Sequence, residues 1–307
     1  MKLRAEHDLC SGVQKCQSLL LKWFCTPEYK TKKELMKKYR FIIFLLFSII
    51  AADPLCAEET ISMVTTDFCP YVCISEKEDG RNGFVLDIFR YIFEKKGYAV
   101  KFEIQPWTRA LKTYNDKGPF DGILAATKIH PINKEIAVFP ETEICRYTHK
   151  FYALKDSPLV GKWKYTGVES LKNIQLGAIK DWSYSSAEVT KYVNDGGSHV
   201  NPMYGSDLVS RNMGMLLKKH TELYVENEFM VSYFLYKEKK AGNKKMENIV
   251  PADSVPIDEG AENSYPVFYK DKNGEKYAKI FTEGMKELRT SKLDSIMAGY
   301  GLEDWRK

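Results

Sequence analysis

The sequence predicts an α/β protein made of two successive units of alternating strands and helices. Residues 61–126 are typical of a β-α-β-α-β order, and residues 174–236 continue the same alternation. Strands that alternate with helices favour parallel sheets covered by helices. No Gly/Ser-rich or Pro-rich linker separates the two units, so we expect the aromatic-rich crossover at 144–154 to be ordered.

The composition is that of a globular protein. The chain has 307 residues, of which 44% are hydrophobic and 28% charged, so disorder and low-complexity arrays are excluded. The formal net charge of +5 comes entirely from the N-terminus, because residues 58–307 hold 36 basic and 36 acidic residues. The net charge of zero over residues 58–307 argues against a phosphate-binding surface, and we therefore expect no nucleic-acid partner.

The N-terminus is typical of an export signal. Residues 41–52 are apolar without interruption, and as a helix they would rise only about 18 Å, too short to cross a bilayer. Basic residues at 37–40 precede them, and Ala57 offers a small residue for cleavage. We interpret 36–57 as a signal peptide and 1–35 as an upstream extension outside the mature protein, which places the protein in the periplasm. The alternative is a folded N-terminal helix around 19–24.

Cleavage after Ala57 would leave three of the seven cysteines, namely Cys69, Cys73 and Cys145. Thiols of exported chains tend to form disulfides. Pairing of Cys69 with Cys73 costs the least chain entropy, and Cys73 with Cys145 is the competing pair; the sequence leaves both open. The four histidines of the mature chain are scattered, so we expect no metal site and no cofactor.

The periodicity of apolar residues places the elements. Apolar residues recur at helical spacing within 83–97, and Gly97 suits a helix C-terminus. Strands are expected at 61–66, 99–104, 121–126, 174–179, 199–203, 222–225 and 263–270. Further helices are expected at 107–114, 184–193, 207–218, 229–236 and near the C-terminus, with a basic polar loop at 237–245.

Polar and aromatic residues follow the predicted strands, where ligands bind in open parallel sheets. The candidates in the first unit are Asp67, Tyr71, Trp107, Arg109 and Thr127. In the second unit they are Trp182, Ser183, Tyr184, Glu226 and Asn227. Ser183 and Ser185 open a predicted helix whose free N–H groups favour an anion. These groups suit a small polar or zwitterionic ligand.

Structural roles compete with these ligand roles. Trp107 would otherwise be a core residue, Arg109 a partner of a surface acid and Tyr71 a turn residue. Trp182 and Tyr184 would otherwise be surface aromatics. Motifs of nucleophile elbows, phosphate loops, dinucleotide folds and zinc proteases are absent from the sequence, which disfavours an enzyme without excluding one.

Several short motifs, taken in order, resemble extracellular solute-binding proteins of family 3, the polar amino acid type of ABC transporters. They extend from about Ile61 to Leu302 and stand at 64–71, 83–89, 106–111, 118–123, 139–141, 176–179 and 300–302. The resemblance implies a periplasmic binding protein-like fold with two α/β lobes, each with a mixed sheet, joined by two hinge strands. Lobe one would comprise 58–148 plus 266–307, and lobe two 149–265.

The resemblance also implies a function without bond chemistry. A solute would bind between the lobes, hinge closure would trap it, and the closed form, which we expect to be a monomer, would dock on an ABC permease. Two positions depart from the family pattern. Lys134 stands where an Arg usually holds the α-carboxylate, and Asn227 stands where an Asp usually binds the ammonium group. Both departures argue against a standard amino acid and favour a modified one or another small polar solute.

Two alternatives remain from the sequence. Periplasmic dehydratases, such as those of the cyclohexadienyl type, share this architecture and would need an acid or base such as Glu226. A ligand-sensing protein is the other alternative. Turnover of the ligand would identify an enzyme, whereas a binding protein releases its ligand unchanged.

Overall fold

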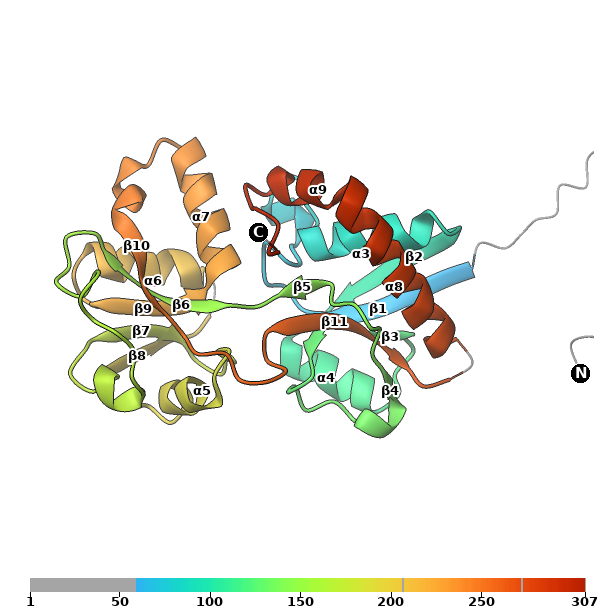
Figure 1. Cartoon of the computed structure of the whole chain (residues 1–307), viewed down its shortest axis with the longest axis horizontal. Helices are drawn as coiled ribbons and strands as arrows, with labels where there is room; N and C mark the ends of the chain where they lie inside the picture. The colour runs from blue at the N-terminus through green and yellow to red at the C-terminus, as the bar shows by residue number, and fades with distance from the viewer. Residues whose placement is uncertain (1–58, 206, 272, 307) are drawn as a thin grey trace, which may run out of the picture. The chain divides into compact units, whose positions relative to one another are not determined.

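The computed structural model describes residues 59–205, 207–271 and 273–306. The predicted extension, signal peptide and cleavage point lie outside these residues. The described chain forms two β-sheets with their own helices (Figure 1). We call the sheet that contains β1 (Glu59–Thr65) lobe 1, and the sheet that contains β6 (His149–Leu154) lobe 2, each with its helices. The predicted α/β class with two mixed sheets is confirmed.

The sheet of lobe 1 has the strand order β2-β1-β3-β11-β4, and β5 also pairs with β11. Its remaining strands are β2 (Tyr98–Ile104), β3 (Gly122–Thr127), β4 (Ala137–Val138), β5 (Cys145–Arg146) and β11 (Asn263–Tyr269). β1 runs parallel to β2 and β3, whereas β11 is antiparallel to β3, β4 and β5. All residues of β3 are buried, as its unbroken apolar run predicts.

The sheet of lobe 2 has the order β10-β6-β9-β7-β8. Its other strands are β7 (Leu176–Ile179), β8 (Val200–Met203), β9 (Leu223–Asn227) and β10 (Ile249–Ser254). β7 is parallel to β8 and β9, while β6 is antiparallel to β9 and β10. Sequence reasoning missed β10 and treated β6 as part of a crossover. β6 instead pairs on both sides, and its aromatic residues lie in the core of lobe 2.

The helices are α3 (Phe84–Glu94), α4 (Trp107–Asn115), α5 (Ala187–Asn194), α6 (Leu208–Leu217), α7 (Glu228–Lys240), α8 (Gly274–Ser291) and α9 (Leu293–Gly299). Short 3-10 turns lie at η1 (Ser75–Lys77), η2 (Lys134–Ile136), η3 (Val168–Leu171) and η4 (Lys244–Asn248). The prediction of a loop over 237–245 is wrong in its first half, because α7 continues to Lys240. Lysines in a last helical turn favour this extension. Within the described ranges, no helix is long and apolar enough to span a membrane.

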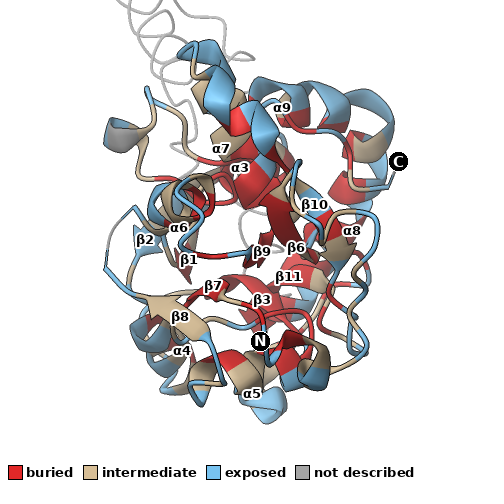
Figure 2. Cartoon of the chain, turned by 90° about the vertical axis from the view of Figure 1, so that its left-hand side faces the viewer, coloured by how far each residue is buried: buried red, intermediate tan, exposed pale blue. Residues whose placement is uncertain are grey.

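The core of lobe 1 forms where α3 meets α8 and α9. α3 buries one apolar face, and Figure 2 shows its buried residues in red. Phe89 stacks on Phe93 with ring centroids 4.5 Å apart, and Phe281 of α8 lies 6.3 Å from Phe89. Each fully buried aromatic or aliphatic side chain contributes about 1.5–3 kcal/mol. The helical periodicity of the sequence correctly predicts both this helix and the face that it buries.

Two crossings connect the lobes and run side by side. The first follows β5, and Tyr147 in it donates its backbone N–H to Glu262 O at 2.6 Å. The second precedes β11, and Val255 donates its N–H to His149 O at 2.9 Å. The pairing of β11 with β3 and β5 places residues 263–265 in the sheet of lobe 1, whereas the lobe boundaries predicted from the sequence assign these residues to lobe two. The exact ends of the lobes stay a prediction.

α7 belongs to lobe 2 by sequence but packs against lobe 1. Phe229 and Tyr233 of α7 lie in the same hydrophobic cluster as the core of lobe 1. Tyr233 donates its hydroxyl to Glu78 Oε2 at 2.8 Å, and Lys237 Nζ contacts the same oxygen at 2.6 Å. These contacts hold the first loop of lobe 1 against lobe 2.

The cysteine pairing left open by the sequence is resolved as Cys69–Cys73, with the two Cα atoms 4.5 Å apart. Cys145 is a buried free thiol in β5. The bridge closes the loop that follows β1, so it shapes the edge where the candidate ligand residues Asp67 and Tyr71 lie.

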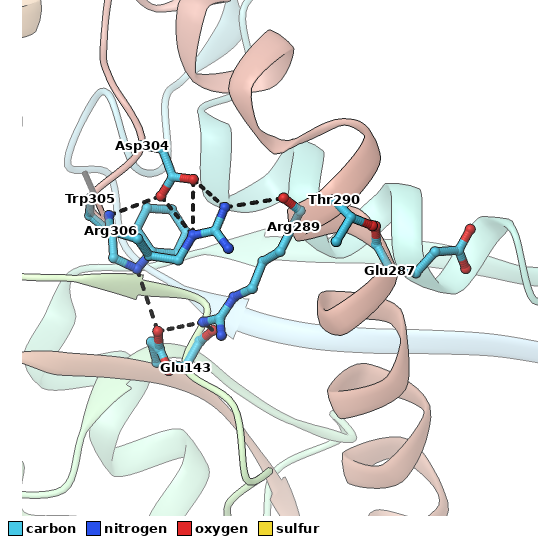
Figure 3. A network of polar contacts seen from close by, with 7 residues as sticks. All are labelled: Glu143, Glu287, Arg289, Thr290, Asp304, Trp305 and Arg306. Atoms are coloured by element: carbon cyan, nitrogen blue, oxygen red, sulfur yellow. Dashed lines mark hydrogen bonds and ion pairs between the residues drawn. The ribbon is translucent and has the colours of Figure 1, made fainter.

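A polar network anchors the C-terminal tail beside the first crossing (Figure 3). Arg289 of α8 forms an ion pair with Glu143, which precedes β5. Trp305 donates its indole N–H to Glu143 Oε1 at 3.5 Å, and Arg306 donates to Arg289 O at 3.1 Å. Asp304 accepts from the Arg306 guanidinium. The tail is thereby fixed to the segment where the chain leaves lobe 1.

Candidate functional site

The carboxyl ends of three parallel strands form one edge of lobe 1. Thr65 ends β1 directly opposite Ile104, which ends β2. Thr127 ends β3 on the other side of β1. Asp67 is exposed just beyond β1, and α4 begins at Trp107 just beyond β2. Ligands in α/β proteins bind at such an edge.

Trp107 meets a histidine that sequence reasoning did not select. Its ring lies 4.9 Å from the ring of His130 in an edge-to-face arrangement. His130 Nδ1 accepts the backbone N–H of Thr127 at 2.9 Å. Burial lowers the pKa of His130 to about 4, so its ring is neutral at pH 7 with the proton on Nε2. The signal for His130 in the sequence is its position three residues after the end of a buried strand.

The same edge carries three cationic side chains. Arg109 in the first turn of α4 and Lys128 after β3 are exposed, and neither forms an ion pair with another described residue. Lys134 is the third cation and a predicted ligand residue. Its ammonium group donates a hydrogen bond to Lys128 O at 2.6 Å, and its Nζ lies 4.9 Å from the ring centroid of Phe139. Partial burial and the neighbouring Lys128 lower the pKa of Lys134. Lobe 1 therefore offers positive charge to a ligand.

In lobe 2, the predicted residues after β7 divide between surface and core. Trp182 is half-buried and Ser183 is exposed. Tyr184 is only 1% exposed; its hydroxyl accepts Ile179 N–H and donates to Ile179 O, both at 2.8 Å. The surface alternative for Tyr184 is therefore wrong, and its hydroxyl is committed to the adjacent strand.

The helix N-terminus that we predicted to bind an anion is occupied by the protein's own carboxylate. α5 begins at Ala187, after Ser186, and not at Ser183 or Ser185. The Ala187 N–H donates to Asp258 Oδ2 at 2.6 Å. Ser185 is buried and donates its hydroxyl to Tyr147 O at 3.3 Å. Asp258 is acidic and comes from the second crossing, and no local pattern predicts its place beside α5.

Asn227 and Tyr71 bind each other across the two lobes. Tyr71 donates its hydroxyl to Asn227 Oδ1 at 2.8 Å and to Arg146 O at 3.2 Å. Asn227 Oδ1 also accepts the N–H groups of Phe229 and Met230 at the start of α7. Tyr71 is 1% exposed and lies in a turn, where its N–H donates to Phe68 O at 3.1 Å, so the structure agrees with the turn alternative. Both residues are committed to the structure in this conformation.

Glu226 lies inside β9 rather than after it, and it has no exposed surface. Its carboxylate accepts the Tyr224 hydroxyl at 2.5 Å and the Asn227 N–H at 2.7 Å. Burial raises the pKa of Glu226 from its usual 4.5 to about 7. A solute cannot reach this carboxyl group in the present conformation.

We expect Glu226→Gln to raise stability at pH 8 and to flatten its pH dependence. The folded protein retains a proton on Glu226 between pH 4.5 and about 7, where the unfolded chain has lost it. Stability therefore falls as pH rises through this window, by at most about 3 kcal/mol. Urea unfolding of both proteins at pH 5 and pH 8 measures the effect. Glu94→Gln, at an exposed acid on α3, is the control, and a wild-type pH profile for Glu226→Gln would contradict the assignment.

One short segment of the second crossing touches both candidate edges. Asp258 binds the first turn of α5 in lobe 2, and it also donates its N–H to Ser185 O at 2.8 Å. A Cβ atom on Gly260 would lie 3.4 Å from Lys128 Cβ and 3.8 Å from Ile129 Cγ2 in lobe 1. Two residue steps span at most about 7 Å. The edges therefore come within small-molecule distance of each other beside this segment.

Two surface hollows lie elsewhere. One of about 440 Å³ lies between α7 and η4, and one of about 320 Å³ lies beside the start of α3 and α9. Neither is lined by a predicted ligand residue. In the part of the chain that the structure describes, no three His, Cys, Asp or Glu side chains are grouped to hold a metal ion.

Comparison with known proteins gives a consistent result. A family model described as bacterial extracellular solute-binding proteins, family 3, matches residues 61–303. The fold is similar to the unliganded, open L-cystine solute receptor of Neisseria gonorrhoeae, with a TM-score of 0.56 and 18% identity over 80% of this chain and 94% of that one. No match is found among curated proteins.

Two further solved structures are similar in fold. One comes from work on glutathione import via GshT and the cystine ABC importer TcyBC of Streptococcus mutans; its TM-score is 0.58, with 14% identity over 80% of this chain and 97% of that one. The other is a histidine kinase sensor domain with similarity to periplasmic binding proteins; its TM-score is 0.57, with 16% identity over 80% and 99% of the two chains.

Proposed function

Because the chain belongs to family 3 of the bacterial extracellular solute-binding proteins, we propose that it captures a small charged or polar solute between its two lobes. The protein acts in the periplasm as a monomer and delivers its solute to the permease of an ABC transporter. The observation that supports this most directly is the Asp258–Gly260 segment, which contacts α5 in lobe 2 and the Lys128 loop in lobe 1. A solute held beside it would touch both lobes and favour their closure.

The ligand residues that we propose are those exposed or half-buried at the two edges. In lobe 1 they are Asp67, Trp107, Arg109, Lys128 and His130, with Thr127 and Lys134 supporting them. In lobe 2 they are Trp182 and Ser183. Calorimetric titration of the purified protein with a broad panel of small metabolites tests the proposal. A panel without any binder would refute it.

We expect Trp107→Ala and Arg109→Ala each to weaken solute binding about tenfold or more while leaving the melting temperature nearly unchanged. Arg109 is exposed and forms no ion pair with another described residue, so its removal costs little stability. Trp107 is half-buried against the core of lobe 1, and its expected small cost rests on the part of its ring that reaches solvent. Titration calorimetry and thermal melting measure the two effects. Lys112→Ala, on the same helix and in an exposed ion pair with Asp116, is the control. A large loss of stability instead would make Trp107 and Arg109 structural.

An enzymatic role of the dehydratase type is the less supported alternative. The acid that it would use, Glu226, has no exposed surface and is covered by its own hydrogen-bond partners. Recovery of the bound solute and its analysis by mass spectrometry separates the two functions. A binding protein returns the solute unchanged, whereas a dehydratase returns a product lighter by one water.

A further inference from the structure

The exposed large apolar side chains of the described chain are not scattered over its surface. Four are at least 37% exposed, namely Ile104, Ile129, Tyr204 and Ile257. Ile104 is the last residue of β2, Ile129 follows β3, and Tyr204 follows β8 directly. Ile257 lies in the second crossing, next to Asp258. Single exposed apolar residues need no explanation, but all four lie at the two carboxyl edges or in the crossing between them.

Two of these side chains belong to segments that contact each other. Gly260 brings the second crossing against Ile129, and Ile257 lies three residues before Gly260 in the same crossing. Trp107 and Trp182 add half-buried aromatic surface, one at each edge. A fully polar solute would leave this apolar surface in water, whereas a solute with an apolar body would cover it.

On the side of lobe 1, the cations at this surface outnumber the one exposed acid that we place there, Asp67. Lys128 adjoins Ile129, and Arg109 lies on the helix that begins just beyond Ile104. On the side of lobe 2, Asp258 already fills the anion position at α5. An anionic group of the solute is therefore attracted to lobe 1. Asp181, which is exposed after β7, could pair with an amino group of the solute, but the charge pattern does not require the solute to have one.

We propose that the solute is a carboxylate with a sizeable apolar body, aromatic or branched aliphatic, whose carboxylate is held by Arg109 and Lys128 and whose body lies against Ile129 and Trp107. This inference rests on the proposed function and narrows its substrate class. It assigns Ile129 as a specificity residue that contacts the solute and carries no charge.

Titration calorimetry with three probes tests the inference: 3-phenylpropionate, propionate and 3-phenylpropanol. We expect 3-phenylpropionate to bind at least tenfold more tightly than propionate, which lacks the apolar body, and than the alcohol, which lacks the charge. Glutamine and glutamate serve as polar probes of similar size. Tighter binding of either one than of 3-phenylpropionate would overturn the inference and leave the proposed function standing. Absence of binding by every probe and by the metabolite panel would refute both.

A matched pair of variants tests the assigned residue. Ile129→Ser should weaken 3-phenylpropionate binding at least fivefold without lowering the melting temperature, because Ile129 is already 46% exposed. Ile280→Ser, at a partly exposed isoleucine on α8, should leave binding unchanged. Equal affinities for Ile129→Ser and the unmodified protein would overturn the role of Ile129 and with it the apolar subsite.

Discussion

Gly83→Ala is expected to destabilise the protein by about 4 kcal/mol. Gly83 precedes α3 with a φ of +99°, a conformation that side chains rarely adopt. A Cβ atom there would lie 2.4 Å from Tyr71 O and 2.7 Å from Val72 Cα, which are backbone atoms that cannot turn aside. Backbone strain and overpacking each cost about 1–3 kcal/mol.

Thermal unfolding measures this effect, and a loss of about 10 °C in melting temperature corresponds to it for a chain of this size. Gly97→Ala is the matched control, because Gly97 also has a positive φ, of +81°, but no atom within 4 Å of the added Cβ. The control should lose only about 1 kcal/mol. Equal losses in the two variants would show that the contact with the Tyr71 backbone is not important.

Tyr71→Ala is expected to destabilise the protein by about 3–5 kcal/mol, because it removes a buried aromatic ring at the junction of the lobes. The ring lies 4.8 Å from Phe84 in lobe 1 and 5.9 Å from Phe229 in lobe 2, and Tyr147 of the first crossing is 5.0 Å away. Urea unfolding measures the loss. The cavity left behind would be lined by residues of both lobes.

Tyr71→Phe separates the ring from the hydroxyl. This variant loses the hydrogen bonds to Asn227 and Arg146, but Asn227 Oδ1 keeps its two N–H donors from α7. We expect a cost of only about 1 kcal/mol and no change in solute affinity. A loss of affinity with unchanged stability would restore the original prediction that Tyr71 contacts the ligand.

The sequence predicted the lobes better than it predicted the site. Strands and helices in lobe 1 follow from apolar periodicity, which is a local property, and α3 is the clearest case. The side chain of Asn227 shows why the site residues could not be predicted in the same way. Its place after an apolar strand favoured a ligand role, yet its oxygen is used by Tyr71 and α7, and Tyr71 lies far away in sequence. No local pattern reports such a partner.

His130 and Asp258 were missed for the same reason. His130 became a candidate only through its contacts with Trp107 and Thr127. Asp258 lies in a crossing without strong periodicity, and its carboxylate meets α5 because the crossing passes that helix. Local patterns were enough to predict the alternation of strands and helices, the zero net charge of residues 58–307 and the residues at the strand ends. Which of those residues bind one another and which remain exposed follows from the folded arrangement, because hydrogen bonding and burial depend on chain segments that are distant in sequence.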